Sequence, residues 1–171
     1  MKKSAIILIF IFNFVMCRNV FAEKASALIT GTAADSKISG RIDFEDSTDG
    51  LKVKAEIHNV SSGKHGFHVH ENGSCADSGK AAGGHFNPEG VVHGLITKDG
   101  FMHAHAGDLG NFEVGADGNG RFEAVVPNMA LSGKYNVTGK AVILHEKEDD
   151  FGQPTGNAGG RIGCGVIEPQ S

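Results

Sequence analysis

The chain contains no helix-length stretch in which apolar residues recur every three or four positions. Instead, short apolar or alternating runs follow one another, with Gly, Asp, Asn and Ser between them. Such runs are typical of strands in an antiparallel sandwich or barrel. The eight runs that we interpret as strands are 27–31, 37–44, 51–59, 66–70, 111–114, 120–126, 139–145 and 163–167. The pattern therefore predicts an all-β fold.

Two long segments do not fit this strand pattern. Both are rich in glycine and polar residues, and loops of this length inside a domain are usually functional. Segment 72–108 contains Cys75, His85, His93, His103, His105 and Asp108. Segment 146–161 contains Asp149, Asp150 and Arg161. We expect these two loops, together with one face of a strand, to build the functional site.

Two histidines, His68 and His70, lie two positions apart near the end of a predicted strand. Side chains alternate between the faces of a strand, so both imidazoles project to one side. Such a pair alone would more often be ordinary strand histidines than metal ligands. Here further histidines follow in loops or at strand ends, namely His85, His93, His103, His105 and His145. Because imidazole is the commonest metal ligand and suits zinc and copper, we predict a metal site.

The first 22 residues have the pattern of a secretory signal peptide. A charged start precedes an apolar run over 5–16, and Val20 and Ala22 occupy the −3 and −1 positions of a cleavage site. The run is shorter than the roughly 18 apolar residues that a membrane-spanning helix needs. We expect cleavage after Ala22, one mature domain over 23–171, and an exported protein, periplasmic or secreted, that is not bound to a membrane.

Cleavage of the signal would change both the cysteine count and the charge. Cys17 leaves with the signal, and Cys75 and Cys164 remain. In an oxidising compartment, two distant cysteines more often form a disulfide than stay free. The signal carries three of the 16 basic residues and none of the 20 acidic ones, so the mature chain has a net charge of −7. This acidic balance argues against a nucleic-acid partner.

Five ordered segments resemble the copper/zinc superoxide dismutases, over essentially the whole mature chain. They are GFHVHENGSC (66–75), GGHFNPEG (83–90), HAGDLGN (105–111), ILHEKEDD (143–150) and TGNAGGRIGCGVI (155–167). Five motifs in one order are far more specific than any one of them. The resemblance implies an eight-stranded antiparallel Greek-key barrel or sandwich with two long functional loops. It also implies an enzyme that dismutates superoxide to dioxygen and hydrogen peroxide, and we expect an exported, bacterial form.

The resemblance also implies one copper and one zinc per subunit. It places the copper ligands on His68, His70, His85 and His145. It places the zinc ligands on His85, His93, His105 and Asp108. His85 would bridge the metals by losing both ring protons, so we expect occupancy of the two sites to be coupled. His103 could compete with His105 for zinc, but His105 keeps the motif spacing to Asp108.

Other motif residues are assigned to supporting roles. Asp149 corresponds to an aspartate that accepts hydrogen bonds from one copper and one zinc histidine, here His68 and His93, with Asp150 as the alternative in register. Such contacts fix the tautomer and the orientation of each ring. His65, which precedes a motif glycine, is expected to bond the backbone beneath the site.

Catalysis and loop anchoring complete the implied roles. Cys75 and Cys164 match the family's disulfide, which would attach the metal loop to the last strand. Arg161 would hold the superoxide anion near copper, and Thr155 would narrow the channel. His85 would leave copper and take up a proton when the metal is reduced. The alternative for Arg161 is an ordinary solvated charge.

The sequence departs from the common eukaryotic pattern in three places. Segments 75–85 and 93–105 are longer, and the end, 166–171, replaces the apolar tail that helps eukaryotic members dimerise. The sequence therefore leaves a monomer and a homodimer as alternatives.

Other classes of protein share parts of this pattern. A non-catalytic copper-binding or copper-delivery domain of the same fold is the alternative function, although such relatives typically lose a copper ligand or the arginine. An inert adhesion sandwich would explain the strands and a disulfide but not the histidines. A zinc hydrolase would need an open position on zinc, which the predicted closed shell does not leave.

Overall fold

The computed structural model describes residues 22–170, so the predicted signal peptide lies outside the described residues except for Ala22. The strands are β1 (Lys24–Gly31), β2 (Ser39–Ser47), β3 (Gly50–His58), β4 (Gly63–His70), β5 (Asp108–Val114), β6 (Asn119–Val126), β7 (Ala141–His145), β8 (Arg161–Val166) and β9 (Glu168–Pro169). Two short helices, η1 (Lys80–Ala82) and α1 (Ile96–Asp99), lie between β4 and β5. Each of the eight predicted strands is present, and the two-residue β9 is additional.

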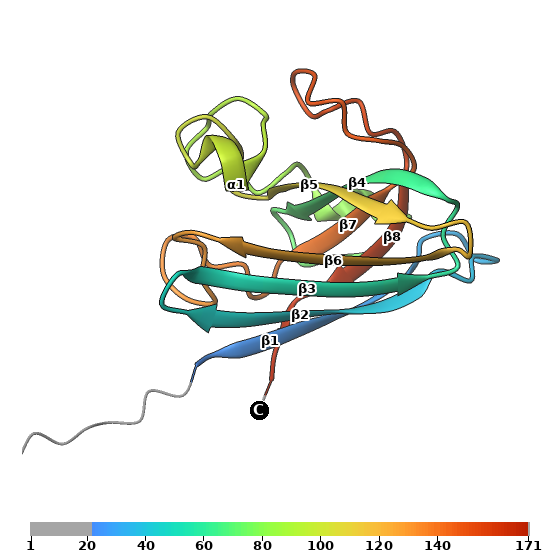
Figure 1. The fold of residues 1–171 in the computed structure, drawn as a ribbon, viewed down its shortest axis with the longest axis horizontal. Coiled ribbons are helices and arrows are strands. Elements are labelled where there is room, and N and C mark those ends of the chain that lie inside the picture. The colour runs from blue at the N-terminus through green and yellow to red at the C-terminus, as the bar shows by residue number, and fades with distance from the viewer. Residues whose placement is uncertain (1–21, 171) are drawn as a thin grey trace, which may run out of the picture.

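The first eight strands close into an antiparallel barrel (Figure 1). The order is β2-β3-β6-β5-β4-β7-β8-β1-β9, and a further pairing between β1 and β2 completes the ring. β3 pairs with β6, whereas β4 pairs with β5 and β7, so the chain crosses from one hairpin to the next as in a Greek key. The predicted all-β Greek-key barrel is therefore confirmed.

Alternation of side chains along the strands produces the core. In β3 the buried positions are Leu51, Val53, Ala55 and Ile57, and the residues between them are exposed. Full burial of a side chain such as Leu or Ile contributes about 1.5 to 3 kcal/mol. The ring of Phe67 from β4 lies 5.6 Å from that of Phe112 and 5.3 Å from that of Phe122, which joins three strands inside the barrel.

Strands β4 and β7 differ from β3 because both of their faces are covered. Phe67 and Val69 of β4 face the core, whereas His68 and His70 lie on the other face and are also buried. Every residue of β7 is buried as well. Something other than the barrel interior must therefore cover the outer faces of these two strands.

Two long loops provide this cover. The first loop (71–107) connects β4 to β5, and the second loop (146–160) connects β7 to β8. Figure 1 shows both loops on the side of the barrel formed by β4, β5, β7 and β8. Within residues 22–170, the structure has no helix that is both long and apolar enough to cross a membrane.

Candidate metal centre

The outer faces of β4 and β7 supply the first group of imidazoles. His70 on β4 donates from Nδ1 to the carbonyl oxygen of Gly83 at 3.0 Å. His145 at the end of β7 donates from Nδ1 to the carbonyl oxygen of Gly159 at 3.4 Å. These bonds leave the two Nε2 atoms facing each other at 3.4 Å. In each ring, one nitrogen is held by a carbonyl and the other is free to bind a ligand.

Two further histidines complete a buried group of four. His68, His70, His85 and His145 each offer one nitrogen, and these atoms lie within 4.8 Å of one another. The rings of His68 and His85 lie 4.2 Å apart. Nδ1 of His68 is buried and has no hydrogen-bond partner. An unpartnered buried polar atom costs free energy, so a group that it can bind is expected at this point.

A second group gathers around Asp108, the first residue of β5. Its members are His85, His93, His105 and Asp108, all buried. Oδ1 of Asp108 lies 2.7 Å from Nδ1 of His85 and 3.2 Å from Nδ1 of His105. The Nδ1 atoms of His85 and His105 are 3.4 Å apart. Ligands of a tetrahedral metal with bonds of about 2.0–2.1 Å lie about 3.3 Å from one another, which is close to this separation.

His93 gives the clearest indication that the second group holds a cation. Its Nδ1 lies 2.8 Å from Oδ2 of Asp108, yet it makes no hydrogen bond. Nδ1 of His93 and Oδ2 of Asp108 would lie in this way if both were ligands of one positive ion. Three imidazoles and a carboxylate suit zinc, and four imidazoles suit copper. The two groups therefore fit these two metals, and His85 belongs to both.

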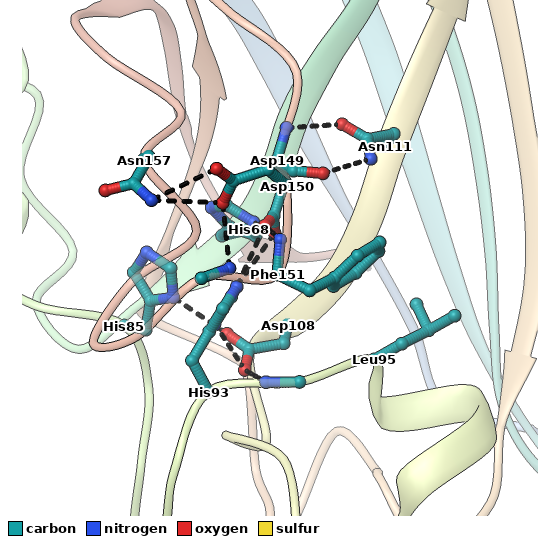
Figure 2. Close-up of polar contacts among 12 residues, drawn as sticks. His68, His85, His93, Leu95, Asp108, Asn111, Asp149, Asp150, Phe151 and Asn157 are labelled. Atoms are coloured by element: carbon teal, nitrogen blue, oxygen red, sulfur yellow. Dashed lines mark hydrogen bonds and ion pairs between the residues drawn. The ribbon is translucent and has the colours of Figure 1, made fainter.

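Asp149 in the second loop connects the two groups. Its Oδ2 accepts a hydrogen bond from Nε2 of His68 at 2.8 Å, and its carboxylate accepts from Nε2 of His93 at 3.0 Å (Figure 2). The backbone of Asp149 is held by Asn111 of β5, which donates to its carbonyl at 2.9 Å and accepts from its N–H at 2.8 Å. Asp150, the alternative in register, is exposed and accepts hydrogen bonds from Asn157 instead.

Burial makes the histidines of the first group poor bases. It lowers the pKa of His68 to about 4, that of His145 to about 3 and that of His70 to about 2. Repulsion between neighbouring imidazoles acts in the same direction, although less strongly. These rings are therefore neutral at neutral pH, which is the form that binds a metal.

The second group favours a positive charge instead. Burial alone would lower the pKa of His93, but the close carboxylates of Asp108 and Asp149 raise it to about 9. Burial would also raise the pKa of both carboxyls, but hydrogen bonds from the histidines hold each pKa well below its usual range. The position between the two carboxylates therefore attracts a cation, whether a proton or a metal ion.

Arg161 begins β8 beside the first group. Its Nη1 donates to the carbonyl oxygen of Gly79 and its Nη2 to that of Gly83, both at 2.6 Å. Partial burial lowers its pKa, but a guanidinium stays charged in proteins. Its charge adds to the lowering of the pKa of His70 and His145, which places it near the first group. Thr155 is exposed in the second loop.

The predicted disulfide between Cys75 and Cys164 is confirmed. It joins the start of the first loop to β8, with the two Cα atoms 5.7 Å apart. The carbonyls of Gly79 and Gly83 that hold Arg161 therefore lie in a segment attached to the same strand as Arg161.

The remaining histidines lie outside both groups. His65 is buried beneath the site, and its ring nitrogens lie 2.9 Å from the carbonyl oxygens of His145 and Ser61, as predicted. His58 is exposed and contacts Asn119 at 2.8 Å. His103 is exposed, whereas His105 is buried in the second group.

Two carboxamides that hold the backbone of the site were missed in the sequence. Asn111 lies inside the HAGDLGN motif, so the motif offered a signal for it. Gln153 bonds the backbone of His93, and nothing in its local sequence indicates this contact.

Comparisons with known proteins agree with this geometry. Residues 38–167 match the family model of copper/zinc superoxide dismutase. The chain is 36% identical over 169 residues to an extracellular copper/zinc superoxide dismutase of Caenorhabditis elegans, covering 90% of this chain and 75% of that protein. It is 32% identical over 163 residues to the protein of the same name from Brugia pahangi, covering 90% and 80%.

A solved structure agrees as well. The crystal structure of the clock protein EA4 shares 37% sequence identity and has a TM-score of 0.78, covering 87% of this chain and 96% of that one. The two relatives above are nematode proteins, and a bacterial source for this chain stays a prediction. From the match to the family model and the identity to these relatives, the chain belongs to the copper/zinc superoxide dismutase family.

Proposed function

We propose that this protein dismutates superoxide to dioxygen and hydrogen peroxide. Copper would be held by His68, His70, His85 and His145, and zinc by His85, His93, His105 and Asp108. The observation that carries the proposal is that these two buried groups of four share one member, His85. His85 would offer one ring nitrogen to each group, which would couple the occupancy of the two sites.

Copper, when bound, supplies the one-electron oxidation and reduction that the reaction needs and that zinc cannot perform. The protein would hold it with nitrogens that are already neutral and oriented. Nδ1 of His70 and of His145 are each bonded to a carbonyl oxygen, so only Nε2 of each ring is available. Little reorganisation is then needed when a metal binds.

His85 is the residue that we assign to proton transfer. Its Nδ1 lies among the ligands around Asp108, which leaves Nε2 on the side of the first group. The ring would stay anchored through Nδ1 while Nε2 takes up or releases a proton. Reduction of superoxide to hydrogen peroxide consumes protons, so a proton carrier at this position serves the reaction.

Arg161 is the residue that we assign to substrate binding. Superoxide is an anion, and the predicted mature chain carries a net charge of −7, so a local positive region has to overcome the average field. The guanidinium is held in place by the carbonyls of Gly79 and Gly83. Thr155, exposed in the second loop, would narrow the approach.

Localisation and assembly are also proposals. The two nematode relatives are named extracellular enzymes, which supports secretion of this chain rather than specifically a periplasmic location. A homodimer stays an expectation without support from the contacts described.

The test combines metal analysis with a superoxide-consumption assay on the purified protein. We expect one copper and one zinc per chain and superoxide consumption that scales with copper content. His70→Ala should abolish both copper binding and turnover, whereas His58→Ala, an exposed histidine outside both groups, should change neither. A protein that binds copper without consuming superoxide would instead be the copper-binding or copper-delivery domain considered above.

A further inference from the structure

The backbone around His93 is held almost entirely by side chains. Residues 91–94 make no backbone-to-backbone hydrogen bond within the part of the chain that the structure describes. Instead, Asn87 bonds both the N–H and the carbonyl of Val91, and Asp108 accepts from the N–H of Gly94. A segment without regular secondary structure depends on such contacts to keep one conformation.

Gln153 supplies the corresponding contacts for His93 itself. Its Oε1 accepts from the N–H of His93 at 3.0 Å, and its Nε2 donates to the carbonyl oxygen of His93 at 2.9 Å. His93 is 3% exposed, so these backbone groups belong to a buried residue. In the described structure no other protein group bonds them. Loss of the carboxamide would leave both groups to find water or remain unpaired.

The same part of the second loop also contacts the ring of His93. Asp149 accepts the hydrogen bond from Nε2, and the ring of Phe151 lies nearly parallel to the imidazole, with centroids 6.3 Å apart and planes inclined by 21°. We call Asp149, Phe151 and Gln153 the His93 clasp. It fixes the imidazole and the backbone of one residue from a loop about sixty positions away in sequence.

The clasp itself is held in an unusual local conformation. Phe151 has φ of 60°, in the left-handed region that residues with bulky side chains rarely adopt. Its N–H donates to Oδ1 of Asp149 at 2.8 Å, which closes a turn two residues long. In this conformation, the side chains of Asp149, Phe151 and Gln153, at alternate positions of the loop, all contact His93.

We propose that Gln153 is a positioning residue for zinc: by fixing the backbone of His93, its carboxamide sets how tightly the protein holds the metal. The role rests on the zinc assignment proposed above. Gln153 does not reach the ligand atoms, so it acts through His93. Supporting residues of this kind typically change metal affinity by about 10- to 100-fold when they are lost.

The test is the zinc dissociation constant, measured by competition with a chelator on the purified wild type, Gln153→Ala and Gln153→Met. Methionine keeps the length of the side chain but has no amide, so both variants should bind zinc about ten-fold or more weakly. The matched control is Gln170→Ala, because Gln170 is the only other glutamine in the sequence and bonds Ala25 and Asp43 instead. The control should bind zinc as the wild type does.

Two further readouts separate positioning from a general loss of stability. Cobalt(II) added in place of zinc should give a changed visible absorption in both Gln153 variants, because the ligand geometry changes. Measured without zinc, so that coupling between the two sites does not contribute, the copper affinity of the first group should stay within about two-fold of the wild type, since the variants act on one of the zinc ligands. A merely structural contact would lower the thermal midpoint of the protein without metals and leave the zinc dissociation constant unchanged.

Failure of the positioning role can be distinguished from failure of the zinc assignment. If the wild type binds zinc and cobalt, but both Gln153 variants bind zinc within about two-fold of it, the positioning role is wrong and the zinc assignment stands. If the wild type binds neither metal in the second group, the zinc assignment is itself overturned, and the positioning role with it.

Discussion

Removal of the Cys75–Cys164 disulfide should weaken stability and activity together. The bond spans 89 positions of the chain, so it greatly restricts the unfolded state. In the chain-entropy model, a closed loop of that length contributes about 4.6 kcal/mol at 25 °C. For a domain of this size, such a loss lowers the thermal midpoint by about 9 to 18 °C.

Replacement of Cys75 by alanine should cost little stability beyond this loss of chain entropy, because the packing of the folded state changes little. Cys164 is 2% exposed and packs with Ala82, Ala141 and Ile143, where a free thiol remains as a small apolar group. The effect on activity has a separate cause, because the segment that starts at Cys75 carries the carbonyls that hold Arg161. Once released from β8, this segment should hold the guanidinium less firmly.

The assay is urea unfolding of the wild type and Cys75→Ala after removal of metals, each with and without a reducing agent. Reductant should bring the wild type down to the level of the variant and should leave the variant unchanged. The turnover per bound copper should fall in the variant. A loss below about 1 kcal/mol, or a variant that responds to reductant as the wild type does, would refute this reasoning.

Three further predictions concern the metals, the substrate and pH. His85→Ala should uncouple the metals more than His105→Ala does; if added zinc perturbs the copper spectrum equally in the wild type and in His85→Ala, the bridge is wrong. Arg161→Ala should keep both metals but lose most of the turnover and most of its dependence on ionic strength, while Arg161→Lys should recover part of the rate. If the alanine variant has the wild-type rate and the wild-type dependence on salt, Arg161 is only a surface charge. Without metals, the protein should lose stability as the pH falls from about 6.5 toward 4, because burial lowers the pKa of His68 to about 4 and the unfolded chain binds the proton first. Urea unfolding at pH 6.5 and pH 5 measures this, and greater stability at pH 5 would contradict it.

Most of the fold could be predicted from sequence because strand alternation is a local property. In β3, the residues from Leu51 to Ile57 alternate between apolar and polar without a break, and the structure buries the apolar ones. The two-residue β9 and the four-residue α1 carry too short a pattern to be read in this way. Their positions depend on the neighbours against which they pack rather than on their own sequence.

In the site too, some residues could be predicted from the sequence and others could not. The histidines stood out because imidazoles are few and occur in motifs, and the structure brings the predicted ligands into two groups. The resemblance assigned Asp149 with Asp150 as the alternative in register, and the contacts of the Asp149 carboxylate with His68 and His93 show that Asp149 faces inward. Gln153 could not be foreseen, because its contact depends on how two distant loops meet.

Closure of the barrel also affects how the protein behaves at high concentration. A sheet with a free edge offers unpaired N–H and carbonyl groups to which another chain can add a strand, and this is a common route to aggregation. Here β1 pairs with both β2 and β8 and completes the ring, although β5 and β6 share only the pair Val114 and Gly120. Within residues 22–170, the strand at the border of the sheet is β9. That strand is two residues long and ends in Pro169, which has no N–H to donate. The border strand therefore offers almost no template for a misfolded copy, and the unpaired backbone groups that could serve as one lie between β5 and β6.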